Sequence, residues 1–339
     1  MVDSSTESRF AYRLFGMQVA SNAPIDGLRA VESRGKAELT LRFYSQPLPD
    51  ALASPKKLRY ASEDLNGLGA PVVQVWELGA GEIHYVDYCD GTEFWLDRQL
   101  TTVWVQWRKP SSFESMLTYL LGPVFGLLLR LKGVVCLHAS AVVIENAAVV
   151  FAGSEGAGKS TTAAGFAKQG FAVLSDDVAA IKECGDEGYE AIPAYPQLNL
   201  WPASVKLLYG GEDALPAIVE DWDKKFLALG GQESARFEER CVPLGPIYVF
   251  DETVEEPQLL AAPLSQRDAL IALVANTYAA NLLDTEQRAQ EFAFLSRLVE
   301  RVPVRKLNPR RGEWTIAQLC NAIRTDLQGI HTWQQLPAD

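Results

Sequence analysis

The first third of the chain alternates between hydrophobic and polar residues with the period of two that is typical of β-strands. Leu39, Leu41 and Phe43 are each separated by one polar or amphipathic residue. The same pattern recurs in four further runs, at residues 72–78, 82–88, 92–97 and 101–107. Turns that contain glycine separate these runs, which predicts an antiparallel meander or a small barrel. We therefore expect a β-rich N-terminal domain over residues 1–110.

The next segment, residues 111–132, has the pattern of an apolar helix. Ser111 followed by Glu114 has the spacing of a capping box, so it predicts the start of the helix. The run from Met116 to Leu129 is shorter than the ~20 residues that a membrane-spanning helix needs. We expect a buried helix that connects two domains, and no contact with a membrane.

The rest of the chain mixes strand and helix patterns, which predicts an α/β domain over residues 133–325 and a C-terminal tail over 326–339. Ser265 and Asp268 predict the start of a helix that carries Leu270, Leu273, Val274 and Tyr278. The other expected elements are two strands at 134–144 and 147–152 with a turn at Glu145-Asn146, a helix that ends near Gly170, a strand at 171–174, an ordered loop from Pro193 to Pro202, and a helix at 286–301.

Composition and charge exclude several classes of protein. The 339 residues are 48% hydrophobic and 22% charged, which is typical of a globular protein. With 31 Lys plus Arg against 43 Asp plus Glu, the net charge of -12 disfavours nucleic acid as a partner. The N-terminal residues lack a secretory signal, and the five scattered cysteines predict reduced thiols in a cytoplasmic protein. The oligomeric state stays open, a homo-oligomer included.

A glycine-rich motif follows the second strand of the α/β domain. Residues 153–160 read GSEGAGKS, which matches the phosphate-loop (Walker A) pattern G-x-x-x-x-G-K-[ST], and a strand precedes it while a helix follows. That context favours a nucleotide site over a chance glycine turn. Lys159 would reach the β- and γ-phosphates, and Ser160 would ligate Mg²⁺. The predicted nucleotide-binding residues are Gly153, Ser154, Glu155, Gly156, Ala157, Gly158, Lys159, Ser160 and Thr161.

Three further side chains are candidates for the chemistry. Asp176 and Asp177 follow the strand at 171–174, where α/β sheets place ligands. We expect one of the two carboxylates to hold Mg²⁺ and the other to orient a hydroxyl acceptor and accept its proton. An exposed turn or a helix cap is the alternative for the pair. His138 follows the apolar run VVCL and is either catalytic or a hydrogen-bonded structural residue.

The motifs LHASAV, GSEGAGKST and LSDDV, taken together, resemble the catalytic core of the HPr kinase/phosphorylase family and its serine-kinase relatives. That family shares its phosphate-loop fold with phosphoenolpyruvate carboxykinase. The resemblance covers residues 133–325, and it implies a catalytic role for Lys159. It also implies that Asp176, with His138, orients the acceptor and accepts its proton, and that Asp177 completes the metal site with Ser160. Ala139 stands where the family has Gly, and the glycine- and arginine-rich segment for dephosphorylation is missing. Because of these departures, the resemblance does not extend to phosphorylase activity or to HPr as the substrate, and both stay open.

The resemblance implies an ATP- and Mg²⁺-dependent kinase that transfers the γ-phosphoryl group to a hydroxyl, in particular to a serine of a peptide or protein. The N-terminal third and the Pro193–Pro202 segment look like the divergent HPr-kinase-like proteins of modified-peptide gene clusters. A kinase acting on a small molecule such as free serine, and an inactive nucleotide-binding regulatory protein, are the alternatives. Arg236, Arg240 and Arg267 are candidates for contacts with phosphate or a carboxylate.

Overall fold

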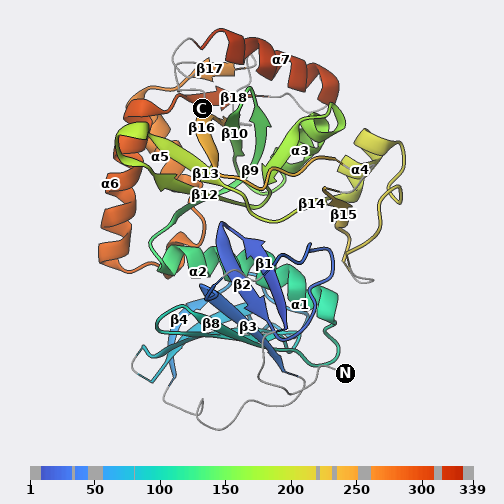
Figure 1. Ribbon diagram of the computed structural model, residues 1–339, viewed down its shortest axis with the longest axis vertical. Helices are drawn as coiled ribbons and strands as arrows, with labels where there is room; N and C mark the ends of the chain where they lie inside the picture. The colour runs from blue at the N-terminus through green and yellow to red at the C-terminus, as the bar shows by residue number, and fades with distance from the viewer. Residues whose placement is uncertain are drawn as a thin grey trace. The chain divides into compact units, whose positions relative to one another are not determined.

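The computed structural model divides the chain into two compact units, and we describe each by itself (Figure 1). Unit 1 comprises Met1–Lys132 and Ala279–Leu283, and unit 2 comprises Gly133–Tyr278 and Asp284–Asp339. The structure describes residues 9–32, 35–44, 56–79, 81–218, 222–230, 235–250, 261–308 and 315–330. The helix expected to connect two domains therefore belongs to unit 1.

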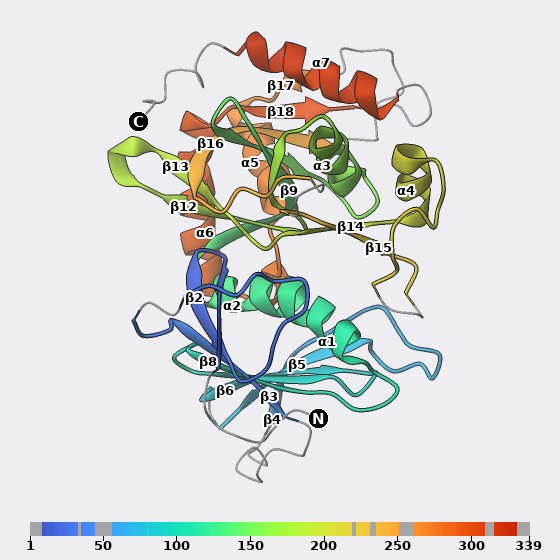
Figure 2. The ribbon, with the colours of Figure 1, turned by 45° about the vertical axis from the view of Figure 1, so that its right-hand side comes forward.

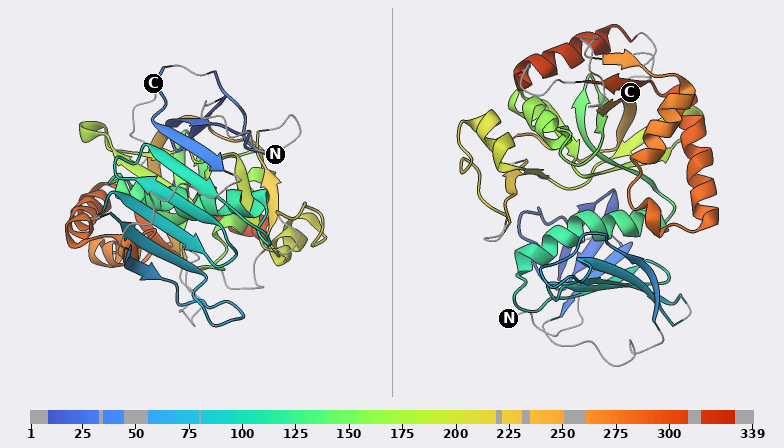
Figure 3. Two further views of the ribbon diagram at one scale, coloured as in Figure 1. Left: turned by 90° about the horizontal axis from the view of Figure 1, so that it is seen from below. Right: turned by 180° about the vertical axis from the view of Figure 1, so that it is seen from behind.

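Unit 1 is built on an eight-stranded sheet in the order β1-β2-β3-β8-β7-β6-β5-β4. Figure 3 shows this sheet from two further directions. Its strands are β1 (Phe10–Leu14), β2 (Met17–Ser21), β3 (Leu39–Tyr44), β4 (Lys56–Ala61), β5 (Val73–Leu78), β6 (Ile83–Tyr88), β7 (Glu93–Asp97) and β8 (Thr102–Gln106). The expectation of a purely antiparallel sheet is wrong, because β3 pairs in parallel with both β2 and β8. Residue periodicity gives the face of a strand, but it does not give the direction of its neighbours.

One helical segment packs on this sheet. It consists of α1 (Phe113–Tyr119), a π-turn at η2 (Leu120–Val124) and α2 (Phe125–Leu131). The N-cap is Ser112 and not Ser111, because the Ser112 side chain accepts the amide of Ser115. The segment Phe113–Leu131 is long and apolar enough to cross a membrane by length and composition alone, yet 67% of its most apolar 18-residue window is buried. Ring stacking of Tyr119 on Tyr88 of β6, with centroids 3.9 Å apart, shows that the sheet covers part of it.

Unit 2 has three layers, with a mixed sheet between two groups of helices (Figures 1 and 2). Its strands are β9 (Val135–Ile144), β10 (Ala147–Ala152), β11 (Ala172–Ser175), β12 (Val178–Glu183), β13 (Tyr189–Ile192), β14 (Gln197–Leu200), β15 (Lys225–Ala228), β16 (Val242–Phe250), β17 (Ala261–Pro263) and β18 (Val304–Leu307). Its helices are α3 (Lys159–Lys168), α4 (Pro202–Tyr209), α5 (Gln266–Ala275), α6 (Thr285–Arg301) and α7 (Ile316–Gln328), with a short 3₁₀ turn at η3 (Gly185–Glu187). A second 3₁₀ turn, η4 (Ala280–Leu282), belongs to unit 1. The expected α/β class is thus what unit 2 shows.

The side chains of strand β10 are buried on both faces of the sheet. Val149 and Phe151 point to the face covered by α3 and α7, while Val150 and Ala152 point to the face covered by α5 and α6. A strand buried on both faces reads as a continuous apolar run, as in Ala147–Ala152. The β9–β10 turn has positive φ at Glu145 (49°) and Asn146 (65°), so it is the tight turn that the sequence predicts.

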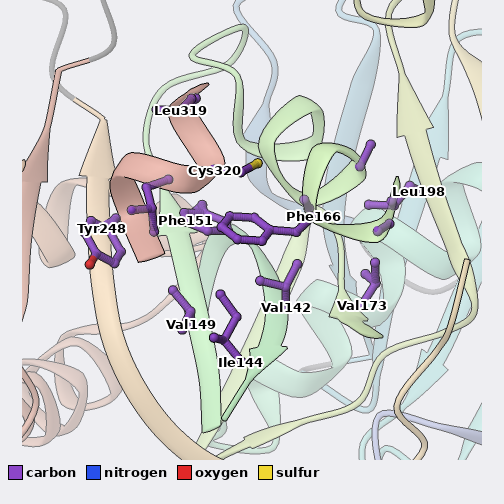
Figure 4. Close-up of a cluster of buried hydrophobic side chains, with 14 of the residues drawn as sticks. Val142, Ile144, Val149, Phe151, Phe166, Val173, Leu198, Tyr248, Leu319 and Cys320 are labelled. Atoms are coloured by element: carbon purple, nitrogen blue, oxygen red, sulfur yellow. The ribbon is translucent and has the colours of Figure 1, made fainter. Parts of the chain in front are cut away.

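The core on the α3 side is centred on two stacked rings, those of Phe151 and Phe166, whose centroids lie 5.7 Å apart (Figure 4). Helix α7 lies against α3 at Gly165, where an added Cβ would lie 2.2 Å from Ile316 Cγ2 and 3.1 Å from Cys320 Sγ. The helix extends to Gln328, so it passes the boundary expected at residue 326. Residues 331–339 of the expected tail lie outside the described residues.

Two other local expectations need correction. Helix α5 ends at Ala275, so Tyr278 is not on the helix but follows it. The segment from Pro193 to Pro202 is not a loop throughout, because Gln197–Leu200 pairs with β15 and Pro202 is the first residue of α4. Proline fits the first helical position because its missing N–H needs no partner there.

Candidate functional site

The predicted phosphate loop lies between β10 and α3. Gly153, Gly156 and Gly158 have φ of 154°, 76° and 102°, values that residues with a side chain rarely adopt. At Gly153 a Cβ would also lie 2.9 Å from Cβ of Phe250, so only glycine fits. Ser154, Glu155 and Gly156 are exposed, Ala157 is buried, and Gly158 is the N-cap of α3.

Helix α3 begins directly at Lys159, so Lys159, Ser160 and Thr161 form its first turn. The amide N–H groups of a first turn have no partners within the helix, and the helix dipole adds positive potential there. This is the arrangement that binds phosphate in many proteins. The geometry of the loop is therefore suited to an anion.

Lys159 is buried, with 6% of its surface exposed. Its Nζ donates to the carbonyl oxygens of Gly153 at 2.8 Å and Ser154 at 2.7 Å. Burial lowers the pKa of Lys159, while the charges of Asp177 and Asp176 oppose that shift. The ammonium group is therefore held inside the curve of the loop, close to both aspartates.

Asp176 directly follows β11 and is 2% exposed. Its Oδ1 accepts hydrogen bonds from Ser140 Oγ at 2.6 Å and Ser160 Oγ at 2.7 Å, and its Oδ2 accepts the amide of Asn199 at 2.9 Å. Burial raises the pKa of Asp176, and these three hydrogen bonds oppose the rise. The carboxylate is thus bonded to β9, α3 and β14 at once.

Asp177 turns the other way, because its φ of 65° reverses the chain between β11 and β12. Its Oδ1 lies 3.3 Å from His138 Nε2, and its Oδ2 accepts the Tyr278 hydroxyl at 3.4 Å. The side chains of His138 and Asp177 are 35% and 36% exposed. Burial by itself would raise the pKa of Asp177. The hydrogen bond from His138 and the charge of His138 outweigh that effect, so the pKa of Asp177 lies below its usual value. Asp177 is therefore an ionised and accessible carboxylate.

The family resemblance implies a pairing of Ser160 with Asp177 and of His138 with Asp176, but the hydrogen bonds connect these residues in the opposite way. Ser160 bonds to Asp176, and His138 bonds to Asp177. Successive residues of a strand point to opposite faces, and this divergence persists just beyond the end of β11. The structure thus divides these four predicted side chains between two hydrogen-bonded groups, while Lys159 bonds to carbonyls of the loop.

Two residues of these groups are absent from the sequence-based predictions. Ser140 lies two positions after His138 on β9, hence on the same face, and both are polar residues in an otherwise apolar strand. That pattern is a signal that could have identified Ser140. Tyr278 is 101 positions from Asp177 in the chain, and no local pattern links the two residues.

Two residues of the Pro193–Pro202 segment, Tyr195 and Asn199, also interact with the two aspartates. Tyr195 is 4% exposed, and burial followed by the charges of Asp177 and Asp176 raises the pKa of its hydroxyl. Asn199 contributes its backbone amide to Asp176, as described above. The three candidate arginines, Arg236, Arg240 and Arg267, are all exposed. Arg240 forms an ion pair with Glu238 at 3.0 Å, and Arg267 lies on α5.

The residues present fit a magnesium ion bound together with phosphate. Ser160 Oγ and Asp176 Oδ1 are hard oxygen ligands only 2.7 Å apart at the start of α3. No cluster of three or more His, Cys, Asp and Glu residues suited to a metal occurs in the described part of the chain. Mg²⁺ is commonly held by one or two protein oxygens, with phosphate oxygens and water completing its shell.

Comparisons with known proteins give little further information. No family model matches the chain, and no curated protein matches it. Among solved structures, the HPr(Ser) kinase/phosphatase from Coxiella burnetii is similar with a TM-score of 0.31 and 12% sequence identity, covering 59% of this chain and 94% of that chain. A likeness at this level carries no functional argument, so the case for function rests on the geometry of the site.

Proposed function

We propose that this protein is a kinase that transfers the γ-phosphoryl group of ATP to a hydroxyl group. One observation carries the proposal: two neighbouring aspartates enter two different hydrogen-bonded groups beside one phosphate loop. Asp176 joins Ser160 at the first turn of α3, whereas Asp177 joins His138 on β9. One carboxylate is thus available for a metal ion and the other for the acceptor.

The loop and Lys159 would bind the phosphates of the nucleotide. In the structure Lys159 Nζ donates to two loop carbonyls, so it is already positioned at the centre of the loop. Phosphate oxygens are stronger acceptors for an ammonium group than carbonyl oxygens are, because the hydrogen bonds are between charged groups. The first-turn amides of α3 would bind the same phosphates.

Ser160 and Asp176 would hold Mg²⁺, which when bound neutralises charge on the phosphate oxygens. Ser140 and the Asn199 amide hold the Asp176 carboxylate in place through hydrogen bonds of 2.6 and 2.9 Å. Positioning of this kind matters because residues around a metal site orient its ligands. Ser140 is therefore a positioning residue in this proposal.

Asp177 would orient the acceptor hydroxyl and receive its proton. The acceptor oxygen forms a bond to the γ-phosphorus while the bond between that phosphorus and the β–γ bridging oxygen breaks, and ADP leaves. A carboxylate whose pKa is below its usual value stays ionised at neutral pH, so Asp177 can accept a hydrogen bond from the acceptor hydroxyl. It would take the proton late, when the new bond to phosphorus has made that hydroxyl acidic. His138 and Tyr278 fix the direction of its two oxygens.

The acceptor that we propose is a serine-type alcohol, in a peptide, a protein or a small molecule such as free serine. The test uses purified protein, Mg²⁺, [γ-³²P]ATP, serine-containing peptides and L-serine. Lys159→Ala should lower transfer at least ~100-fold, as removal of a charge-stabilising group typically does. Asp177→Asn should lower kcat and leave the affinity for Mg–ATP unchanged, because Asp177 contacts the acceptor and not the nucleotide.

Three outcomes would contradict the proposal or one of its steps. Calorimetry that detects no binding of Mg–ATP would remove its basis. Tight binding without any acceptor-dependent transfer would instead favour a nucleotide-binding regulatory protein. An Asp177→Asn variant that keeps the full kcat would show that this carboxylate takes no part in the proton transfer.

A further inference from the structure

The stretch of chain that joins β14 to α4 is hydrogen-bonded to the site at both of its ends. At the first end, the amide of Asn199 donates to Asp176 Oδ2 at 2.9 Å. At the second end, the hydroxyls of Ser204 and Thr161 lie 2.7 Å apart, which joins the first turn of α4 to the first turn of α3. The two helices lie side by side in two views (Figures 1 and 2). Both bonds therefore lead to groups of the proposed nucleotide and metal site.

Trp201 lies between these two hydrogen bonds, two residues after Asn199 and three before Ser204. It is the N-cap of α4, and its carbonyl oxygen accepts the amide of Ser204 at 2.9 Å. Two residues of extended chain span at most ~7 Å, so the backbone of Trp201 lies within about 10 Å of the Asp176 carboxylate. Hydrogen bonds on either side thus hold Trp201 beside the site.

The phosphate loop determines which end of a nucleotide faces this stretch. In such loops the lysine reaches the β- and γ-phosphates, the next hydroxyl ligates Mg²⁺, and the backbone amides bind the α- and β-phosphates. Lys159 and Ser160 would therefore lie at the γ end of the nucleotide. Thr161 is one residue further along the helix and would lie toward the α-phosphate, which carries the nucleoside. Because Ser204 bonds to Thr161, α4 begins on the nucleoside side of the loop.

The indole of Trp201 is suited to a flat ligand. Trp201 is 40% exposed, although it is a large apolar residue. Lys224 Nζ lies 4.8 Å from the centroid of its ring, and this cation–π contact restrains the orientation of the indole. A nucleotide base is flat and aromatic, and bases stack on aromatic side chains in many binding sites. The exposed part of the ring therefore offers a stacking surface.

We propose that Trp201 is a binding residue for the base of the nucleotide, which stacks on its indole. This inference rests on the proposed kinase function and adds the nucleoside end of the same site. Lys159 and the loop amides recognise phosphate alone, and any triphosphate would satisfy them. A contact with the base lets the site prefer a nucleoside triphosphate over an inorganic polyphosphate.

The test compares Mg–ATP with Mg–tripolyphosphate, which carries the three phosphates without ribose or base. Calorimetry measures the Kd of both ligands for the wild type, Trp201→Leu and Trp201→Phe. The matched control is Trp222→Leu. Trp222 is 36% exposed and its ring centroid lies 5.9 Å from the same Lys224 Nζ, but it precedes β15 and lies outside the stretch from Asn199 to Ser204.

We expect Trp201→Leu to bind Mg–ATP about tenfold more weakly, as loss of one stack between a base and an aromatic ring does. Its Kd for Mg–tripolyphosphate should equal that of the wild type, because this ligand has no base. Trp201→Phe should keep most of the affinity for Mg–ATP, and Trp222→Leu should bind both ligands as the wild type does. In transfer assays Trp201→Leu should raise the KM for ATP with little change in kcat.

Three results would overturn the inference. An equal loss of affinity for both ligands in Trp201→Leu would show that Trp201 acts on the loop through Asn199 or Ser204 and contacts no base. Unchanged affinity for Mg–ATP in this variant would place the base elsewhere. A loss confined to Trp222→Leu would assign the stacking to that ring.

Failure of the kinase proposal gives a different result. A wild type that binds Mg–ATP and transfers no phosphoryl group contradicts the kinase, whereas a selective loss of Mg–ATP binding in Trp201→Leu would still support recognition of the base. A wild type that binds neither ligand contradicts both proposals.

Discussion

The contacts of Asp176 predict that the Asp176→Asn substitution removes function without lowering the stability of the protein. Asp176 accepts three hydrogen bonds, and each bond to a charged group contributes about 1.5–3 kcal/mol. Against this stands a desolvation cost of several kcal/mol for a buried ion. The raised pKa of Asp176, with burial as its largest cause, indicates that desolvation outweighs the hydrogen bonds.

Asparagine can keep the hydrogen bonds without the charge. Its amide oxygen can accept from the backbone N–H of Asn199, and its NH₂ can donate to the hydroxyls of Ser140 and Ser160, which rotate to accept. The free energy of unfolding should therefore be unchanged or up to ~1 kcal/mol higher, which is about 2–4 °C in Tm for a unit of this size. Asp176→Ala leaves the fully buried Ser140 hydroxyl without this partner, so it should cost about 1–3 kcal/mol.

The pH dependence has a definite sign. A carboxyl group whose pKa is raised by folding favours the folded state at low pH, and this contribution is lost as pH rises through the folded pKa. The stability of the wild type should therefore fall relative to Asp176→Asn as pH rises above the ordinary range of aspartate. Chemical denaturation of both proteins at a series of pH values measures the difference.

The assay for function is thermal unfolding with and without Mg–ATP. A ligand at ~100 times its Kd stabilises the folded protein by about 2.7 kcal/mol, or roughly 5–10 °C here. The wild type should show this shift, and Asp176→Asn should lose most of it together with ³²P transfer, because a ligand of the metal is gone. If the variant keeps the shift and the transfer, Asp176 holds no metal. If its Tm falls by more than ~10 °C without ligand, the carboxylate is a structural group.

Three further predictions concern the core of unit 2. Gly165→Ala should destabilise the protein by about 1–3 kcal/mol in urea unfolding, because its methyl group would overlap Ile316. A second substitution, Ile316→Ala, should restore part of the lost stability. A single variant as stable as the wild type would contradict the close packing of α3 and α7. Burial raises the pKa of the Cys320 thiol to about 12. Iodoacetamide at pH 8 should therefore label the exposed Cys89 and leave Cys320 unmodified until the protein unfolds. Labelled Cys320 in native protein, detected by mass spectrometry, would refute this prediction. Phe151→Ala should cost about 3–5 kcal/mol, as loss of a fully buried ring does, and a cost under ~1 kcal/mol would show that the ring is not central to this core.

The sequence by itself determined the local parts of the site. The phosphate loop at residues 153–160, with its glycines, lysine and serine hydroxyl, lies between one strand and one helix that are neighbours in the chain. The pattern of the flanking residues identified that strand and that helix. The turn at Glu145-Asn146 followed from residue types that tolerate positive φ. These features depend on neighbours in the chain, so a linear pattern contains them.

Only the tertiary structure decided how the site is connected. Asp176 and Asp177 are adjacent in sequence, yet a reversal at φ 65° sends one to Ser160 and the other to His138 and Tyr278. The order and direction of strands, such as the parallel pairing of β3, were likewise beyond the sequence patterns. Hydrophobic periodicity specifies which face of an element is buried, but the partner across that face is chosen by packing of the whole unit.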